Sequence, residues 1–276
     1  MSDPTWVSED TPAIPRPKGL GWLRVFLRGF VLALVVFGGL LIMVVLRIVE
    51  APVHGARRPW TPFITVAVCR AAFRILGMEY VSHGRRMDHR GAVVANHSSW
   101  MDIFALNAGG RVYFVSKSEV AAWPGIGLLA RVTGTVFINR DRREAAAQKA
   151  VFEDRLAVGH KLLFFPEGTS TDGQRVLAFK PTLFAAFFSD RLRDVLWVQP
   201  VTVVYRAPEG REPRFYGWWG DMEFGEHLLA VLAQSPQGRV EVFWHAPVRV
   251  ADFADRKTLA KTTENAVSGA HPGEKG

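Results

Sequence analysis

The sequence contains a single cysteine, Cys69. One cysteine excludes a disulfide framework within the chain and cannot form a cysteine-rich zinc site. The H-E-x-x-H signature of many zinc enzymes is missing, as is the G-x-S-x-G turn that presents a nucleophilic serine in many hydrolases. The lack of a disulfide framework favours a cytoplasmic location for the globular part of the chain.

Charged residues are few, at 22% of the 276 residues, whereas hydrophobic residues make up 49%. This composition excludes a disordered chain, and the sequence has no internal repeats or low-complexity tracts. The 34 lysines and arginines outnumber the 26 acidic residues, which gives a net charge of +8. Such a charge suits phospholipid head groups, nucleic acid or an acidic carrier protein, although a generally basic proteome would produce it too.

The longest uncharged run covers residues 29–46, between Arg28 and Arg47. As a helix it would span roughly 27 Å, close to the hydrocarbon thickness of a bilayer. A signal peptide is one alternative, but the preceding segment is long and contains acidic residues, and no convincing cleavage site follows. A core helix that is apolar on every side is uncommon in a small domain. The run therefore predicts a membrane anchor.

A second apolar stretch, residues 60–78, carries Arg70 and Arg74 four residues apart. This spacing is typical of a helix that lies in the membrane interface with its arginines towards head groups. Arginines flank the first run on both sides, so the positive-inside rule does not give an orientation. The two stretches could form a helical hairpin in one leaflet.

From about residue 79 the pattern becomes that of an α/β fold. Helical patterns separate several of the candidate strands, the clearest at residues 143–158, and this alternation predicts a mostly parallel mixed sheet flanked by helices. We divide the chain into a disordered tail (1–19), membrane-anchoring helices (20–78), the α/β domain (79–255) and a polar C-terminal tail (256–276). The candidate strands are residues 79–82, 91–95, 112–116, 134–138, 161–165, 195–204 and 239–245.

The stretch GAVVANHSSWMD, residues 91–102, reads as a buried strand, a tight turn and the start of a helix. His97 stands where the strand ends, and Asp102 follows close enough for its carboxylate to orient the imidazole as a general base. The alternative is a serine hydrolase with Ser98 or Ser99 as nucleophile. Serines adjacent to the histidine rarely present a hydroxyl to its ring, so we interpret them as turn or helix-cap residues.

Further polar residues follow other predicted strands. The stretch FPEGT places Glu167, Gly168 and Thr169 after one strand, where a carboxylate can orient hydroxyls and free amides can hold an anion. The stretch GTVFINR places Asn139 and Arg140 after another, and an arginine there suits phosphate or carboxylate. Lys117 is similarly placed. An ordinary turn and solvated basic loops are the alternatives. Pro200 interrupts a buried strand, which predicts an edge or a bulge.

Taken together and in this order, NHSSWMD, GTVFINR, FPEGT and the stretch around Pro200 resemble the four sequence blocks of the glycerolipid acyltransferase family, over about residues 60–250. The resemblance implies that His97 takes the proton of an acceptor hydroxyl, which attacks the thioester of acyl-CoA or acyl-carrier protein directly. Asp102 would orient His97, and Glu167, Gly168 and Arg140 would bind the acceptor. No metal, cofactor or nucleic acid is implied.

One position departs from the family pattern. Phosphate-binding members usually have arginine directly after EGT, where this chain has Ser170. The wider stretch FPEGTSTDGQRV, with FYGWWGDM later, resembles the lyso-ornithine lipid acyltransferase branch most. Arg175 or Lys180 could replace the missing charge, so lysophosphatidate, or both acceptors, remain alternatives. We expect the inner membrane as the location, with the catalytic domain on the cytoplasmic side. The non-enzyme alternative is a membrane-tethered basic binding module.

Overall fold

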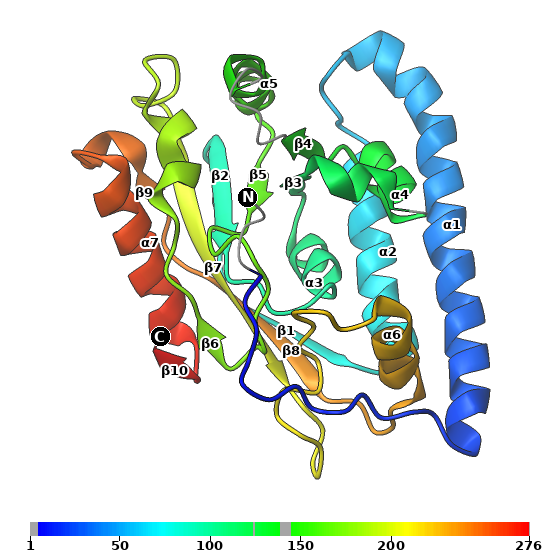
Figure 1. Ribbon diagram of the computed structural model, residues 1–276. Coiled ribbons are helices and arrows are strands. Elements are labelled where there is room, and N and C mark those ends of the chain that lie inside the picture. Colours follow the sequence, from blue (N-terminus) through cyan, green and yellow to red (C-terminus); the bar gives the residue numbers. More distant parts are fainter. Residues whose placement is uncertain (1–4, 124, 139–144, 276) are drawn as a thin grey trace.

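The computed structural model of the chain describes residues 5–123, 125–138 and 145–275 (Figure 1). A seven-strand path with the order β1-β8-β7-β2-β5-β3-β4 forms the main sheet, and β9 pairs with β7 beside it. All pairs are parallel except β7 with β8 and β7 with β9, so the predicted mostly parallel mixed sheet is confirmed. The strands are β1 Glu79–Gly84, β2 Gly91–Ala95, β3 Tyr113–Lys117, β4 Val136–Ile138, β5 Leu162–Phe164, β7 Trp197–Arg206, β8 Arg239–Trp244 and β9 Val248–Arg249.

Helices cover both faces of the sheet. Alternate residues of β2 separate the two cores, because Val93 and Ala95 belong to one buried cluster while Ala92 and Val94 belong to the other. Helices α2, α3 and α6 supply residues to the first cluster, and α5, α7 and a 3₁₀ segment at Pro181–Phe188 supply the second. The helices are α1 Leu20–His54, α2 Thr61–Leu76, α3 Asp102–Gly109, α4 Ile126–Thr133, α5 Ala145–Ala157, α6 Phe224–Ala233 and α7 Arg256–Ala270.

Helix α1 is longer than the uncharged run that predicted it. Its 35 residues make it the one helix of the described chain that is long and apolar enough to cross a membrane. The helix packs against α2 and α6 through small residues: a Cβ on Gly39 would lie 2.4 Å from Val68, and one on Gly29 would lie 3.6 Å from Leu232. The opposite face exposes large apolar side chains from Leu20 to Val53.

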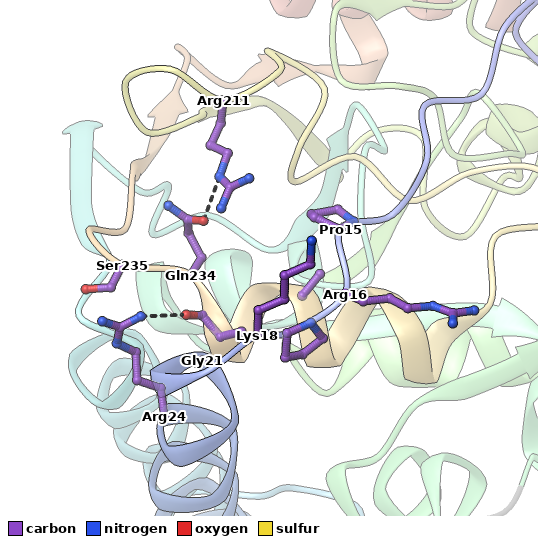
Figure 2. A pocket seen from close by; sticks show the side chains of 11 residues that line it. Pro15, Arg16, Lys18, Gly21, Arg24, Arg211, Gln234 and Ser235 are labelled. Carbon is purple, nitrogen blue, oxygen red and sulfur yellow. Dashed lines mark hydrogen bonds between the residues drawn. The ribbon is translucent and has the colours of Figure 1, made fainter.

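Polar contacts fix both ends of this packing. Near its start, Arg24 donates to the carbonyl of Ala233 at the end of α6, at 3.4 Å (Figure 2). Near its end, the fully buried Glu50 accepts hydrogen bonds from the backbone N–H groups of Trp60 and Thr61, at 2.7 and 3.1 Å. These N–H groups belong to the start of α2, so a side chain of α1 caps its neighbour. The helical hairpin is therefore held by specific contacts.

The C-terminal segment corrects a prediction. We expected a polar tail from residue 256, but residues 256–270 form α7, which buries Leu259, Ala260 and Val267 against the sheet. The side chain of Asp255 caps the helix by accepting from the N–H groups of Lys257 and Thr258. The many polar residues of α7 occupy its solvent face, which hid the short apolar stripe in the sequence.

The position of Pro200 corrects a second prediction in part. Pro200 lies in the central strand β7, paired with Val94 of β2, and not at an edge. On its other side the partner of β7 changes from β8 to β9, and the Pro200 carbonyl accepts from the N–H of His245 in the turn between them. The missing N–H of proline therefore faces a break in pairing, which is why the strand tolerates it.

Candidate active site

The candidate site lies where β2 ends. His97 comes two residues after β2, and Asp102 is the first residue of α3. The Nδ1 atom of His97 lies 2.7 Å from Oδ2 of Asp102. The carboxylate is fully buried, whereas 23% of the His97 side chain is exposed. The structure thus brings the two predicted residues into contact, with the acid inside and the base within reach of a substrate.

The Asp102 carboxylate has three further hydrogen-bond donors. The N–H groups of Ser98 and Ser99 donate to Oδ2 at 2.8 and 3.0 Å, and the Tyr205 hydroxyl donates to Oδ1 at 2.8 Å. Burial, and then the nearby Asp102 carboxylate, raise the pKa of Tyr205 well above its usual value, so this hydroxyl keeps its proton. Since a carboxylate only accepts, His97 donates from Nδ1 and keeps the lone pair of Nε2 for a substrate proton.

Two contacts outside this pair hold the loop and the ring. Asn96 bonds to β7 in both directions, since its amide donates to the Val203 carbonyl at 2.9 Å and its oxygen accepts from the Val203 N–H at 2.8 Å. The His97 ring stacks on Phe165 with 4.0 Å between centroids and 8° between planes. The imidazole is therefore preorganised in both position and tilt.

The two serines after His97 are used in the turn. The Ser99 hydroxyl accepts from the Met101 N–H at 3.3 Å, and the Ser98 hydroxyl accepts from the Asn96 amide at 3.4 Å. Each hydroxyl thus bonds a group of the turn, and a serine nucleophile would instead bond the ring nitrogen opposite the one that contacts Asp102. The geometry therefore favours the turn role over the nucleophile role for both serines, although the residue that immediately precedes α3 is Met101.

Glu167 lies beneath the site. Its Oε1 accepts from the backbone N–H of His97 at 2.7 Å and its Oε2 from that of Leu177 at 2.8 Å, and only 1% of the residue is exposed. Both contacts hold backbone, so the geometry gives this side chain a positioning role in place of the acceptor contact that the sequence led us to expect. Burial raises the pKa of Glu167 to about 8, against the opposing effect of the two N–H donors.

This raised pKa makes a prediction about stability. The unfolded chain ionises Glu167 near its ordinary value of 4.5, whereas the folded chain does so near 8. The contribution of Glu167 to the free energy of unfolding is therefore fully present below about pH 4.5. It is lost as the pH rises to about 8, by up to about 1.4 kcal/mol per pH unit. Glu167→Gln should remove this loss, so its melting temperature relative to the parent should rise steadily over that range.

The measurement is a series of thermal melts in detergent across this pH range. A constant offset is expected as well, because the glutamine amide keeps only one acceptor oxygen for two N–H donors. Glu209→Gln, at an exposed loop position, is the matched control and should follow the parent at every pH. If both variants show the same pH dependence as the parent, Glu167 does not titrate as described.

The turn after Glu167 places a cation at the site. Gly168 has a φ of 76°, and a Cβ there would lie 2.6 Å from Nζ of Lys180. The lysine ammonium therefore lies against the FPEGT turn, where only glycine leaves room for it. Of the two residues that could replace the arginine missing at Ser170, Lys180 is the one in contact with this turn.

The other candidate, Arg175, pairs with an acidic side chain. Its guanidinium bonds the buried carboxylate of Asp172, with Nε–Oδ1 and Nη2–Oδ2 distances of 3.3 and 3.1 Å. The same guanidinium lies 5.2 Å from the ring centre of Trp6. Its charge is balanced inside the protein, so Arg175 holds the loop together and contributes little net charge to the site.

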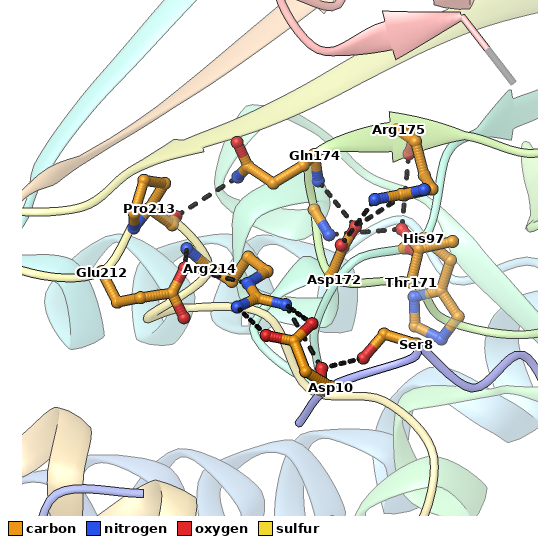
Figure 3. A network of polar contacts seen from close by, with 11 residues as sticks. Ser8, Asp10, His97, Thr171, Asp172, Gln174, Arg175, Glu212, Pro213 and Arg214 are labelled. Atoms are coloured by element: carbon orange, nitrogen blue, oxygen red, sulfur yellow. Dashed lines mark hydrogen bonds and ion pairs between the residues drawn. The ribbon is translucent and has the colours of Figure 1, made fainter. Parts of the chain in front are cut away.

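The N-terminal segment reaches the site, which the sequence did not predict. The backbone N–H of Trp6 donates to the Thr169 hydroxyl at 3.2 Å, and the Trp6 ring centre lies 6.2 Å from that of Trp219. Asp10 pairs with Arg214 at 3.0 Å (Figure 3). Residues 5–19 contain no helix or strand, yet they follow the surface from the FPEGT turn to Leu20, where α1 begins. Thr169 thus contacts the chain's own N-terminal segment.

The remaining predicted site residues lie towards β4. Lys117 is the exposed last residue of β3, paired in register with Ile138 of β4. Asn139 and Arg140 come directly after β4 and lie outside the described residues, so their predicted roles stay predictions. Among the residues that the structure describes, no group of three or more His, Cys, Asp or Glu side chains could hold a metal ion.

Tyr205 is the residue of the site that sequence reasoning missed. It is separated from Asp102 by 103 positions and appeared only as the residue that follows a predicted strand. Because β7 runs parallel to β2, the carboxyl ends of both strands meet at one edge of the sheet. That rule could have indicated Tyr205, but it requires the strand order, which the sequence pattern does not give.

A histidine held by a buried carboxylate at the end of a parallel strand, with a cation-bearing turn beside it, is the arrangement of an enzyme that uses a general base. The comparisons agree with this class. A family model described as Acyltransferase matches residues 72–206, and this chain belongs to that family.

Two relatives carry a narrower description, and one solved structure shares the fold. A lyso-ornithine lipid O-acyltransferase of Rhodobacter capsulatus is 57% identical over 97% of this chain and 97% of its own length. A protein of the same description from Brucella abortus is 38% identical over 72% of this chain and 78% of its own length. The 1-acyl-sn-glycerophosphate acyltransferase PlsC of Thermotoga maritima shares the fold, with a TM-score of 0.65, 22% identity, and coverage of 90% of this chain and 93% of that one.

Proposed function

We propose that this acyltransferase moves a fatty acyl group from acyl-carrier protein or acyl-CoA to the free hydroxyl of a membrane lysolipid, with lyso-ornithine lipid as the leading acceptor. The observation that carries the reaction is the 2.7 Å contact between Nδ1 of His97 and buried Asp102. It leaves the lone pair of Nε2 to act as the base, on a side chain that is 23% exposed.

In this mechanism the Nε2 atom of His97 takes the proton of the acceptor hydroxyl while the oxygen attacks the thioester carbonyl. The tetrahedral intermediate collapses, the carbon–sulfur bond breaks, and the departing thiolate takes the proton back from the imidazolium. The products are an ester and a free thiol, and no acyl-enzyme forms. Asp102 stabilises the imidazolium between the two proton transfers, and Tyr205 and the Ser98 and Ser99 amides hold Asp102 in place.

The acceptor is inferred from Ser170 and from the relatives. Lyso-ornithine lipid carries a carboxylate and an amine, and a cationic amine is better accommodated without an arginine at position 170. Lys180, beside Gly168, offers one cation for the carboxylate. The relatives that match nearly the whole chain or most of it are named for this acceptor. Lysophosphatidate is the second candidate, because the Lys180 ammonium could also bind a phosphate.

The test restores the family arginine. Ser170→Arg should raise the ratio of lysophosphatidate to lyso-ornithine lipid turnover by about tenfold or more, since a hydrogen bond to a charged group is worth roughly 1.5–3 kcal/mol. Purified enzyme is assayed with each acceptor against labelled acyl-CoA and acyl-carrier protein. Thr262→Arg adds the same charge on the exposed face of α7 and should leave the ratio unchanged. Exclusive use of lysophosphatidate by the parent enzyme would refute the proposed acceptor.

We propose further that α1 and α2 lie within one leaflet and do not span the bilayer. One face of α1 is occupied by protein along its length, from Gly21 beside Ala233 to Gly39 beside Val68. Only the opposite face, with its exposed apolar side chains, is free for lipid. A spanning orientation would force α6 and its polar neighbours into the hydrocarbon, at a cost of several kcal/mol for each unsatisfied group. We place the catalytic domain on the cytoplasmic side of the inner membrane.

A further inference from the structure

A cavity of about 340 Å³ lies outside the His97 site, between the N-terminal segment, the first turn of α1 and the end of α6 (Figure 2). Four cationic side chains line it, and no aspartate or glutamate is among the described residues of its lining. They come from separate parts of the sequence: Arg16 and Lys18 precede α1, Arg24 lies on α1, and Arg211 belongs to the loop before α6.

Among the residues that the structure describes, Arg24 and Arg211 of this cavity bond neutral groups, and Arg16 has one weak acidic partner. Arg211 donates from Nε to the side-chain oxygen of Gln234 at 2.8 Å, and Arg24 donates to a backbone carbonyl, so both bond neutral groups. Arg16 has a carboxylate at 4.0 Å, that of Glu226, but both side chains are largely exposed and such a pair is worth little. Each guanidinium has five N–H donors, and these contacts use a minority of them.

The helix that borders the cavity adds to the positive electrostatic potential of the four cations. The first turn of α1 contributes Gly21 to the lining, and that turn contains no acidic residue and has no side-chain cap. The N–H groups of Gly21 and Trp22 donate to the carbonyls of Lys18 and Gly19, so the turn contributes mainly the partial positive charge of a helix N-terminus, which stabilises an anion. The cavity therefore combines a helix N-terminus with four side-chain cations from three segments.

We propose that this cavity binds the phosphate of an anionic membrane phospholipid. Leu20 and Trp22 flank Gly21, which lines the cavity, and they are 69% and 54% exposed at the start of the apolar surface of α1. A phosphate held by Lys18 and Arg211 would therefore have its acyl chains alongside these residues. Tryptophan at such a boundary is typical of the membrane interface. The lipid bound here is a component of the surrounding leaflet, separate from the acceptor that is acylated at His97.

This apolar border distinguishes the phospholipid from other anions. Free phosphate would also be attracted to the cations, but it has no apolar part that could cover the exposed Leu20 and Trp22 side chains. An acidic carrier protein is distinguished by the binding test below. His97 is not among the described residues that line this cavity, so lipid binding here does not depend on which acceptor the active site uses.

The test measures binding of short-chain phosphatidylglycerol to the full-length protein in detergent, followed by tryptophan fluorescence. Lys18→Ala/Arg211→Ala removes one cation from each side of the cavity and should weaken binding by about 30-fold, at about 1 kcal/mol per cation. Arg256→Ala/Lys257→Ala removes two exposed cations from the start of α7 and should change binding less than about twofold. Lys18→Arg/Arg211→Lys keeps both charges and should retain most of the affinity.

Melting temperatures of all variants identify any that fail to fold, and in that case the charge-preserving variant gives the comparison. Equal losses in the cavity and α7 variants, or no loss in either, would overturn the proposal. Two further probes separate the sources of the anion. If inorganic phosphate binds as tightly as the lipid, the cavity is a site for free phosphate. If Lys18→Ala/Arg211→Ala loses affinity for acyl-carrier protein but binds the lipid as the parent does, the cavity is a site for that protein. Either result would refute the phospholipid site.

Discussion

Replacing His97 by alanine should lower the rate of acyl transfer by about 10²–10⁴-fold, which is what a positioned general base typically contributes. The variant loses the only ring nitrogen that contacts Asp102, while the carboxylate keeps its hydrogen bonds from Ser98, Ser99 and Tyr205. The fold and membrane attachment should therefore persist. The measurement is turnover of labelled acyl donor with lysolipid, together with the melting temperature of the purified variant.

Two controls make the result specific to this histidine. His89→Ala removes another exposed histidine, one that stacks on Trp197, and should keep near-parental turnover. Ser98→Ala should also remain active, because the Ser98 hydroxyl bonds Asn96 and not the His97 ring. Retained turnover in His97→Ala, or labelling of a serine by a fluorophosphonate probe, would contradict direct transfer and favour a hydrolase-like mechanism.

Asp102→Asn should have an effect of similar size, about 10²–10⁴-fold on kcat. The asparagine amide cannot accept from all the groups that now point at the carboxylate, and it removes the charge that stabilises the imidazolium. It also allows His97 to adopt the wrong tautomer, with the proton on Nε2. Because the acceptor does not touch this buried residue, we expect kcat to fall while KM for the lysolipid changes little.

Tyr205→Phe provides the graded comparison for this prediction. It removes one hydrogen bond to Asp102 and keeps the ring, so kcat should fall by about tenfold to 100-fold, the value of a hydrogen bond to a charged group. Combined with Asp102→Asn, it should add little, because both changes act through the same carboxylate. Additive losses in the double variant, or an Asp102→Asn enzyme with parental kcat, would show that Asp102 does not act by holding the base.

The elements that the sequence predicted best are those whose signal is local. The strand at residues 91–95 matches β2 because its five residues are small or apolar and all are buried. Strand and helix boundaries elsewhere agree to within a few residues, as at β7 and α5. The C-terminal helix was missed, since only a narrow stripe of α7 is apolar and the rest resembles a solvated tail.

The contacts of the site likewise differ in how far the sequence predicts them. His97 and Asp102 lie within one turn of chain, so their contact follows from local geometry. The contacts of Glu167 depend on how the FPEGT turn packs under the His97 backbone, which its sequence does not specify. The contact of Trp6 with Thr169 joins positions 163 residues apart, and no periodicity or motif carries that information.

By itself the sequence determined the α/β class, the apolar helix, the histidine–aspartate pair and the family. Each rests on residue type and short spacing, which act over a few residues of chain. Only the tertiary structure decided which residues complete the site: Tyr205 on Asp102, Lys180 at Gly168, and the cations of the cavity beside α1. These depend on strand order and on packing between distant segments, because a long-range contact is fixed by the free energy of the whole fold and not by the residues on either side of it.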